Sequence, residues 1–296
     1  MEIIVLGAGA GGGLPQWNCG CANCAAARVG HIPAMTQSSV AVSADGERWL
    51  LLNASPDIRQ QIAAAAALHP RGLRGSPVEA VLLTNGEVDH VAGLLTLRER
   101  TPFALYATPE IHAVLREDGI FGVLHPELVA RREVEPGRTF RPLPGLSVTL
   151  FPVPGKAPLY REGAAPKTGA PGGETVGVAI RAGAARAFYI PGCAAMTPAL
   201  AARLRGAPLV MFDGTLWRDD EMPAGGTGEK TGARMGHMAM DGPEGSIAAL
   251  AGLEIAQKVF VHINNTNPVL DPASPERATA DAAGWTIAQD GMAFRL

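Results

Sequence analysis

A turn rich in metal-binding side chains follows the most strand-like run of this chain. The mostly apolar run Val78–Leu83 is typical of a buried strand, and the residues after it bring Glu87, Asp89 and His90 into a tight turn. An aspartate and a histidine that are neighbours in a turn can face one cation, because a turn does not alternate its side chains as a strand does. We therefore expect a fold in which the end of this strand opens onto a metal site.

Short strand-like runs recur along the chain, with helix-like segments between only some of them. The strand-like runs are Ile3–Leu6, Ser39–Ser43, Trp49–Asn53, Val78–Thr84, Phe103–Tyr106, Ser147–Phe151, Thr175–Ile180, Ala187–Ile190, Leu209–Asp213 and Lys258–Ile263. The helix-like segments are Asp57–Leu68, Val91–Arg100, Thr197–Leu204, Pro243–Leu253 and Pro275–Ala283. Because some strands follow one another directly, a simple doubly wound sheet does not fit. The order favours the α/β class, as an α/β-β/α sandwich of two mixed sheets flanked by helices.

Two stretches rich in glycine and proline, Pro154–Gly173 and Pro223–Gly236, have the composition of long loops. Loops of this length inside a compact domain are usually functional or mobile. Neither stretch has the length or the charge run of a linker between domains, and the sequence has no internal repeat. We therefore expect a single domain over residues 1–296, which is long enough to bury a substantial core.

The composition excludes some classes of partner. A net charge of −3 and an aromatic content of 5% give no reason to expect nucleic acid. No apolar run approaches the roughly 20 residues that a membrane-spanning helix needs. The first residues, Met1–Leu6, lack the basic segment of a signal peptide and have the pattern of a strand. We therefore expect a soluble cytoplasmic protein.

The glycine-rich segment Gly7–Gly13 allows two interpretations. It contains the Gly-x-Gly-x-x-Gly pattern of dinucleotide-binding turns, in which the N-terminus of the next helix receives the pyrophosphate. The residues that follow, Pro15 among them, are poor helix formers. No acidic residue ends a second strand at the distance that a dinucleotide site requires. We favour a tight backbone turn beside the functional site.

Three of the four cysteines, Cys19, Cys21 and Cys24, form a Cys-x-Cys-x-x-Cys motif. Three thiolates at this spacing can surround one soft cation, and zinc in a closed tetrahedral structural site is the natural occupant. The fourth ligand must come from elsewhere, and the candidates are His31 and His237. The alternatives are ordinary small buried residues or a redox Cys-x-x-Cys pair, which leaves the third cysteine unexplained.

The second candidate metal site is built on Asp89 and His90. A third ligand is suggested by His262, near the end of the strand-like run Lys258–Ile263. Two histidines and one carboxylate leave coordination positions open, which suits non-haem iron(II) and oxygen chemistry, although manganese and zinc accept the same ligands. The further acidic candidates, in the same turn or at strand ends, are Glu87, Asp213 and Glu174. Asp213 is equally suited to cap a turn.

These residues belong to a series of blocks that resembles one known family. The blocks are Gly11–Cys19, Thr36–Ser39, Asn53–Ile58, Val88–His90 with Gly93–Leu94, Asp213–Trp217, Thr231–Gly232, Met235–His237 and His262–Pro268. They span nearly the whole chain, and in this order they resemble pyrroloquinoline quinone biosynthesis protein B, a family with the metallo-β-lactamase fold. The resemblance implies that fold, and cytoplasmic work on the redox cofactor pyrroloquinoline quinone (PQQ), which is assembled from a glutamate and a tyrosine of a precursor peptide.

The turn after Val78–Leu83 departs from the motif of the wider metallo-β-lactamase superfamily, which is His-x-His-x-Asp-His. Here Asn85 and Glu87 take the places of the first two histidines. The hydrolases of that superfamily also use an aspartate that bridges two metals, at a turn that here contains Cys193, which we expect to be a core or loop thiol. The resemblance therefore implies a mononuclear site, and hydrolysis becomes the weakest of three functional hypotheses.

The resemblance implies two other functional hypotheses. In the first, the protein is an iron- and O2-dependent hydroxylase, an oxidoreductase acting on the tyrosine of a cross-linked Glu-Tyr intermediate. His237 and Glu87 would then be catalytic side chains, and basic loop residues such as Arg234 would pair with carboxylates of the intermediate. In the second hypothesis, the protein is a soluble carrier of PQQ or its precursor toward the periplasm. Other proteins of the PQQ pathway are expected partners.

Overall fold

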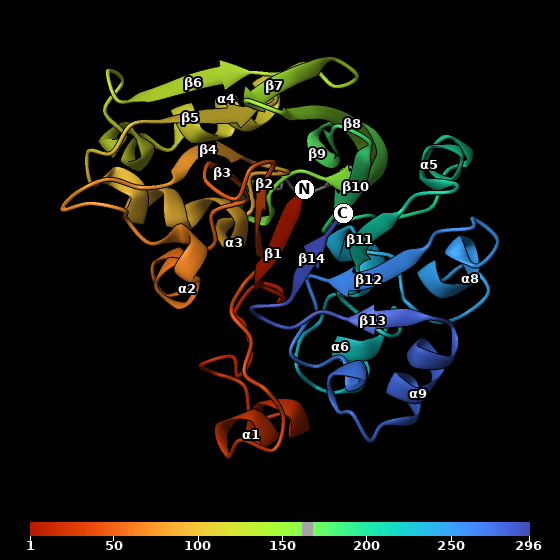
Figure 1. Ribbon diagram of the computed structural model, residues 1–296. Coiled ribbons are helices and arrows are strands. Elements are labelled where there is room, and N and C mark those ends of the chain that lie inside the picture. The colour runs from red at the N-terminus through yellow and green to blue at the C-terminus, as the bar shows by residue number, and fades with distance from the viewer. Residues whose placement is uncertain (162–167) are drawn as a thin grey trace.

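Two β-sheets that face each other form the body of the protein (Figure 1). The computed structural model describes residues 1–161 and 168–296. The first sheet contains, in spatial order, β14 (Ala293–Arg295), β1 (Glu2–Gly7), β2 (Ser39–Ser43), β3 (Trp49–Leu52), β4 (Val78–Leu82), β5 (Phe103–Ala107) and β6 (Val129–Glu133). The second contains β13 (Trp285–Ile287), β12 (Gln257–Val261), β11 (Leu209–Asp213), β10 (Ala185–Ile190), β9 (Thr168–Ala182), β8 (Leu146–Lys156) and β7 (Thr139–Leu143).

Both sheets are mixed. In the first, β14, β1, β2 and β3 pair antiparallel and β3 to β6 pair parallel. In the second, β7 to β10 pair antiparallel and β10 to β13 pair parallel. The parallel halves bring the carboxyl ends of β4 and of β11 and β12 to the edges where loops can build a site.

Helices cover the outer sides of the two sheets. In Figure 1, α2, α3 and α4 lie beside the first sheet, whereas α5, α8 and α9 lie beside the second. The α-helices are α1 (Ala22–Arg28), α2 (Ile58–Ala64), α3 (Val88–Val91), α4 (Pro109–Glu117), α5 (Pro198–Leu204), α6 (Glu221–Ala224), α7 (Gly232–Met235), α8 (Ser246–Leu250) and α9 (Pro275–Ala282). The 3-10 turns are η1 (Ala66–Leu68), η2 (Ala92–Arg98), η3 (Gly119–Val123), η4 (Leu159–Arg161) and η5 (Pro268–Leu270). The expected α/β-β/α sandwich of two mixed sheets is confirmed.

Strand β3 shows how the sequence specifies this layering. Its four residues are fully buried, but Leu50 and Leu52 pack in the core between the sheets, while Trp49 and Leu51 pack under the outer helices. Successive side chains of a strand point to opposite faces, so a strand covered on both sides must be apolar throughout. The core between the sheets draws residues from both of them. The single domain expected over residues 1–296 stays a prediction.

The expected loop Pro154–Gly173 is wrong in part. Its first residues extend β8 to Lys156 and its last ones begin β9 at Thr168, and the two ends pair antiparallel. Backbone groups form this ladder, so glycine-rich and proline-rich composition is a poor guide to where it ends. Residues 162–167 of the expected loop lie outside the described residues. The other expected loop, Pro223–Gly236, contains only the end of α6 and the short α7.

Helix boundaries were predicted less well than helix positions. Helices α5 and α9 begin at Pro198 and Pro275, next to capping hydroxyls of Thr197 and Ser274, as their Thr-Pro and Ser-Pro sequences indicate. The segment expected as helix Val91–Arg100 instead starts earlier, as α3, and continues as a 3-10 turn. The other helical segments, 57–68 and 243–253, contain shorter helices than expected. None of the helices in the described part of the chain is long and apolar enough to cross a bilayer.

The glycine-rich segment after β1 is a turn and does not lead directly into a helix. Gly12 and Gly13 have positive φ angles of 94° and 65°, which favour glycine, and α1 begins only at Ala22. A Cβ atom on Gly11 would lie 3.6 Å from the Asp89 carboxylate. The expected tight turn is therefore confirmed and lies beside Asp89, and a dinucleotide-binding turn is not supported.

Candidate metal centres

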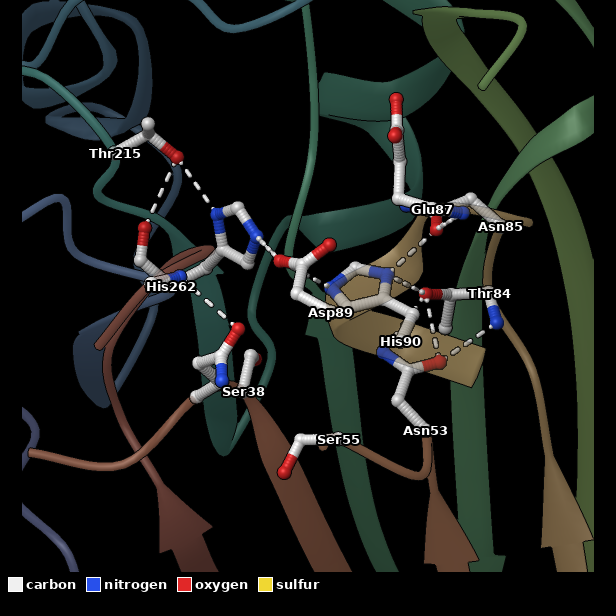
Figure 2. A network of polar contacts seen from close by, with 12 residues as sticks. Ser38, Asn53, Ser55, Thr84, Asn85, Glu87, Asp89, His90, Thr215 and His262 are labelled. Carbon is white, nitrogen blue, oxygen red and sulfur yellow. Dashed lines mark hydrogen bonds and ion pairs between the residues drawn. The ribbon is translucent and has the colours of Figure 1, made fainter. Parts of the chain in front are cut away.

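The first candidate metal centre joins the turn after β4 to the end of β12. In Figure 2 the carboxylate of Asp89 lies between the rings of His90 and His262. Its Oδ2 atom is 3.1 Å from Nε2 of His262 and 3.8 Å from Nε2 of His90. Ligand atoms of the three residues all lie within 4.8 Å of one another. The structure thus brings together the three residues that the sequence singles out.

The imidazole of His90 is oriented by Asn85. The Nδ1 atom of His90 is 2.7 Å from Oδ1 of Asn85, and an amide oxygen only accepts, so Nδ1 carries the proton. Nε2 of His90 is then a lone-pair acceptor, and within the described residues this buried atom has no hydrogen-bond partner. Burying such an atom costs free energy unless something binds it, so its position beside Asp89 fits a cation.

Thr215 orients the ring of His262 in a similar way. Its Oγ1 atom lies 2.8 Å from Nδ1 of His262 and 2.9 Å from the backbone oxygen of the same residue, and Nε2 consequently faces Asp89. His262 has a φ angle of 56°, which is uncommon for a residue with a Cβ atom. The backbone of Ile263 donates to Ala8 and accepts from Ala10, and these two hydrogen bonds hold the chain next to His262. Strain of this kind persists where the surrounding structure requires it, often at functional sites.

Asp213, expected as a possible metal ligand, forms a further group of converging ligand atoms with His237 and His262, all within 4.8 Å of one another, and this group shares His262 with the first. Its Oδ2 atom accepts from Nδ1 of His237 at 2.7 Å and from the backbone of Cys193 at 2.9 Å, while Oδ1 accepts twice from Thr215. The ring of His237 stacks on that of His262, with centroids 5.2 Å apart. Because the proton on Nδ1 is bound to Asp213, Nε2 of His237 remains a base or a ligand.

The charges of the site match the requirements of a bound cation. Burial opposes ionisation of Asp89, but the imidazoles of His90 and His262 outweigh it and lower the pKa of this carboxyl. Burial lowers the pKa of His90 to about 4, so its ring is neutral near pH 7. Burial would also lower the pKa of His262, but the hydrogen bond to Asp89 outweighs it and raises the pKa. A cation bound here would displace the proton on Nε2 of His262.

Two acidic candidates lie away from this cluster. Glu87 forms an ion pair with Lys156, with Oε1 and Nζ 2.6 Å apart, and it is not among the residues whose ligand atoms converge on Asp89. Glu174 is exposed on β9 and does not join any group of converging ligands in the described part of the chain. The alternation of β9 explains this, since its neighbour Thr175 is the buried residue.

The second candidate centre is formed by Cys19, Cys21 and Cys24. Their sulfur atoms lie within 4.8 Å of one another, where the chain enters α1. Neither suggested fourth ligand joins them: His31 is exposed, and His237 belongs to the group of Asp213 and His262. The two candidates proposed from sequence proximity are therefore not brought to the thiolates in this structure.

The remaining cysteine, Cys193, is a buried thiol of the core. Its Sγ atom donates to the backbone oxygen of Ala195 at 3.2 Å, and burial raises the pKa of the thiol to about 12. Cys193 does not belong to any group of converging ligand atoms in the described part of the chain, so it is placed as the core thiol expected from the sequence.

The contacts of Asn85, Thr215 and Lys156 with residues in or next to the first centre were not predicted from the sequence. Asn85 was noted only as the residue that takes the place of a histidine of the superfamily motif. Its side-chain oxygen, five residues before His90, can nevertheless reach the ring of that histidine. Thr215 lies in the Asp-Gly-Thr turn after β11, and this turn was the available signal. Lys156 offered no signal, because it contacts Glu87 from 69 residues away.

The chain is similar to known proteins in both sequence and structure. The family model described as "Beta-lactamase superfamily domain" matches residues 48–263. Proteins named "Coenzyme PQQ synthesis protein B" are 58% identical in Methylorubrum extorquens and 56% identical in Ruegeria pomeroyi, each covering 100% of both chains. The crystal structure of Zn²⁺-bound PqqB from Methylobacterium extorquens, 57% identical, superposes with a TM-score of 0.98 and covers 100% of both chains.

The chain is thus a member of the β-lactamase superfamily, whose model covers most of its length. Within that superfamily it belongs to the coenzyme PQQ synthesis protein B family.

Proposed function

We propose that the protein works in PQQ biosynthesis in the cytoplasm, as an iron(II)- and O2-dependent hydroxylase of a tyrosine ring in a cross-linked Glu-Tyr intermediate. The name of its relatives supports the pathway. The observation that carries the proposed reaction is the convergence of one carboxylate and two imidazoles, Asp89, His90 and His262, on one point. Two histidines and a carboxylate with open positions suit non-haem iron(II), and manganese or zinc is the alternative occupant.

The contacts of Asn85 and Glu87 favour one metal over two. These residues stand where superfamily hydrolases have their first two histidines, and both are engaged elsewhere. Oδ1 of Asn85 accepts from His90 and from the backbone of Glu87, and the Glu87 carboxylate pairs with Lys156. A second ion would lack these ligands, and with it the paired stabilisation of attacking and leaving oxygens in hydrolysis.

Iron(II) at this centre would supply the activation of O2, which amino-acid side chains do not provide. Hydroxylation places one oxygen atom in a ring C–H bond, while the other becomes water with two electrons and two protons from an external reductant. His237 would accept the proton of the tyrosine hydroxyl at Nε2, because Asp213 holds the proton on Nδ1. His237 is accessible for this role, since it borders a pocket of about 910 Å³.

The basic residues near His237 would bind the carboxylates of the intermediate. Lys156 lies against Gly236, where a Cβ atom would be 3.1 Å from Cγ of the lysine, and Arg234 is in α7 just before it. Glu87 holds the Lys156 ammonium group in place. We therefore propose that Glu87 acts by positioning Lys156 and that it is not a metal ligand.

The direct test uses protein purified without oxygen, loaded with iron(II) and mixed with a synthetic cross-linked Glu-Tyr compound, ascorbate and ¹⁸O2. We expect the product to gain one ¹⁸O atom, as measured by mass spectrometry, and no gain when O2 or iron is omitted. Tight binding of PQQ without turnover of the compound would instead favour the carrier. Hydrolysis of a generic phosphodiester that requires two metals per chain would favour the hydrolase.

Asn85 provides a test of how the chain prepares this centre. We expect Asn85→Ala to weaken iron binding by about 10- to 100-fold, because losing the partner of a ligating imidazole typically has such an effect. Asn85→Asp keeps an acceptor oxygen for His90 and should retain most of the affinity. Titration of metal-free protein under anaerobic conditions measures both variants. Equal affinities of Asn85→Ala and the unmodified protein would show that His90 is oriented without Asn85.

A further inference from the structure

A pocket lined by arginines opens on the side of the second sheet that α5 covers (Figure 1). Its volume is about 540 Å³, which lies in the range of small-molecule sites. The charged side chains that line it are Arg181 on β9, Arg186 on β10 and Arg203 on α5, and no acidic residue is among the lining residues that the structure describes. The pocket is therefore a concave surface of purely positive charge.

The register of the sheet concentrates this charge. Strands β9 and β10 pair antiparallel with Arg181 directly opposite Arg186. Side chains at such positions have Cβ atoms about 4.5–5.5 Å apart, and like charges there are destabilising. The whole chain has a net charge of −3, so a basic composition does not explain the arrangement. A bound anion would remove the repulsion.

The chain itself provides no such anion. In the part of the chain that the structure describes, the three arginines take part in no ion pair. Arg186 donates to the backbone oxygen of Gly206 at 3.0 Å and lies over the ring of Phe188, 5.6 Å from its centroid. Arg203 lies over the ring of Phe151 at 4.7 Å. These contacts hold the guanidinium groups in place and leave most of their N–H donors available.

Hydroxyl groups on the same face add further donors. Thr139 and Thr149 lie opposite each other on β7 and β8, and their Oγ1 atoms are 2.7 Å apart. One hydroxyl donates to the other, whose own hydrogen can then point to a ligand. Ser147 of β8 lies opposite Arg181 and continues the row of the two arginines. The pocket thus combines fork-shaped cationic donors with neutral ones.

We propose that this pocket binds a small molecule that carries at least two oxyanion groups, either carboxylates or phosphates. Arginine suits this role because its planar fork pairs with such groups through two parallel hydrogen bonds. Two groups are required because arginines of the sheet and of α5 line opposite parts of the pocket. The concave shape favours a small molecule over the acidic surface of another protein.

The proposed ligand would join α5 to the second sheet, since Arg203 is on the helix and the other two arginines are on strands. The segment Ala194–Met196 precedes α5 and borders the pocket of about 910 Å³ that also contains His237. An occupied anion site would therefore stabilise one wall of that pocket without contacting the candidate metal centres.

The test titrates metal-loaded protein with benzene-1,3,5-tricarboxylate, whose carboxylates are too far apart on the ring to chelate one metal ion. We expect Arg181→Ala to weaken binding by at least about 10-fold in isothermal titration calorimetry, because it removes charge-assisted hydrogen bonds. Arg181→Lys keeps the charge without the fork and should recover part of the affinity. Arg205→Ala is the matched control, because this exposed arginine donates to Gly252 and does not line the pocket.

Thermal unfolding separates loss of the site from loss of the fold. Without the probe and at low salt, Arg181→Ala should melt no lower than the unmodified protein, because it relieves the repulsion with Arg186. The probe should raise the melting temperature of the unmodified protein and of Arg205→Ala, but not that of Arg181→Ala.

Two further ligands define the chemistry of the site. Benzoate has one carboxylate and should bind at least about 10-fold more weakly than the tricarboxylate. Fructose 1,6-bisphosphate tests the other source of oxyanions, and whichever of the two multivalent probes binds more tightly identifies carboxylates or phosphates as the preferred groups. Three results would overturn the inference: equal affinities of Arg181→Ala and Arg205→Ala, equal binding of benzoate and the tricarboxylate, or tighter binding of an acidic peptide than of either small probe.

Discussion

Replacing Asp89 with alanine should abolish hydroxylation and release the ion of the first centre. Asp89 is the only anionic member of its group of three, and it lies between the two imidazoles. Without it, His90 and His262 keep two neutral nitrogens, which bind iron(II) weakly. The loss of affinity should exceed about 100-fold, since even an outer partner of a ligand contributes 10- to 100-fold. Metal analysis of protein prepared without oxygen measures the loss, and the ¹⁸O assay measures activity.

The matched control is Asp45→Ala, which removes another aspartate from a surface turn. Asp45 binds Arg48 and neighbouring backbone groups, and it takes no part in the candidate metal centres. This variant should retain both metals and the activity. The zinc content of Asp89→Ala should also stay unchanged, since the cysteines bind their own ion. Full hydroxylation by Asp89→Ala would disprove the proposed centre, even if the variant had lost some stability.

The sequence specified the architecture and the position of the first centre because both depend on short, local patterns. Asp89 and His90 lie in α3, the first helix after the buried strand β4, and His262 directly follows β12. Strand β4 belongs to the first sheet and β12 to the second, so the centre forms where the loops after parallel strands of the two facing sheets meet. These local patterns predict where a site lies but not the partner of each side chain.

The partners could not be predicted because they depend on the tertiary fold. Glu87 follows the ligand pattern, but the paired ends of β8 and β9 bring Lys156 to it. Asp213 ends a strand as a ligand would, but the loop carrying His237 returns to take up its carboxylate. Neither loop has a periodic pattern from which its path could be derived.

Several strands at the edges of the sheets were not predicted from the sequence, for a different reason. Strands β6, β7 and β14 each have partly or fully exposed residues and form three of the four edges of the two sheets. An edge strand can be short and charged, so its sequence lacks the apolar run by which buried strands are recognised. Helix α4, in contrast, carries a clear signal in Thr108-Pro109, a capping residue followed by proline, that the prediction overlooked.

Replacing Cys24 with serine should release the zinc ion and destabilise the whole chain. A ligand that binds only the folded state adds about 4 kcal/mol when its free concentration is a thousand times its dissociation constant. For a domain of this size each kcal/mol corresponds to about 2 °C, so the melting temperature should fall by about 8 °C. Because Sγ of Cys24 lies 3.3 Å from the side chain of Asn265, three residues after His262, iron affinity at the first centre should fall as well. Calorimetry and metal titration measure the two effects.

Cys193→Ser is the matched control, since Cys24 and Cys193 are both fully buried cysteines. Serine can still donate to the backbone oxygen of Ala195, so this variant should lose only the small free energy of a buried sulfur-to-oxygen change. Its zinc content and iron affinity should equal those of the unmodified protein. Adding a strong chelator should lower the melting temperature of the control but not that of Cys24→Ser. Equal melting temperatures of both variants in zinc would show that the cysteine-bound ion does not stabilise the fold.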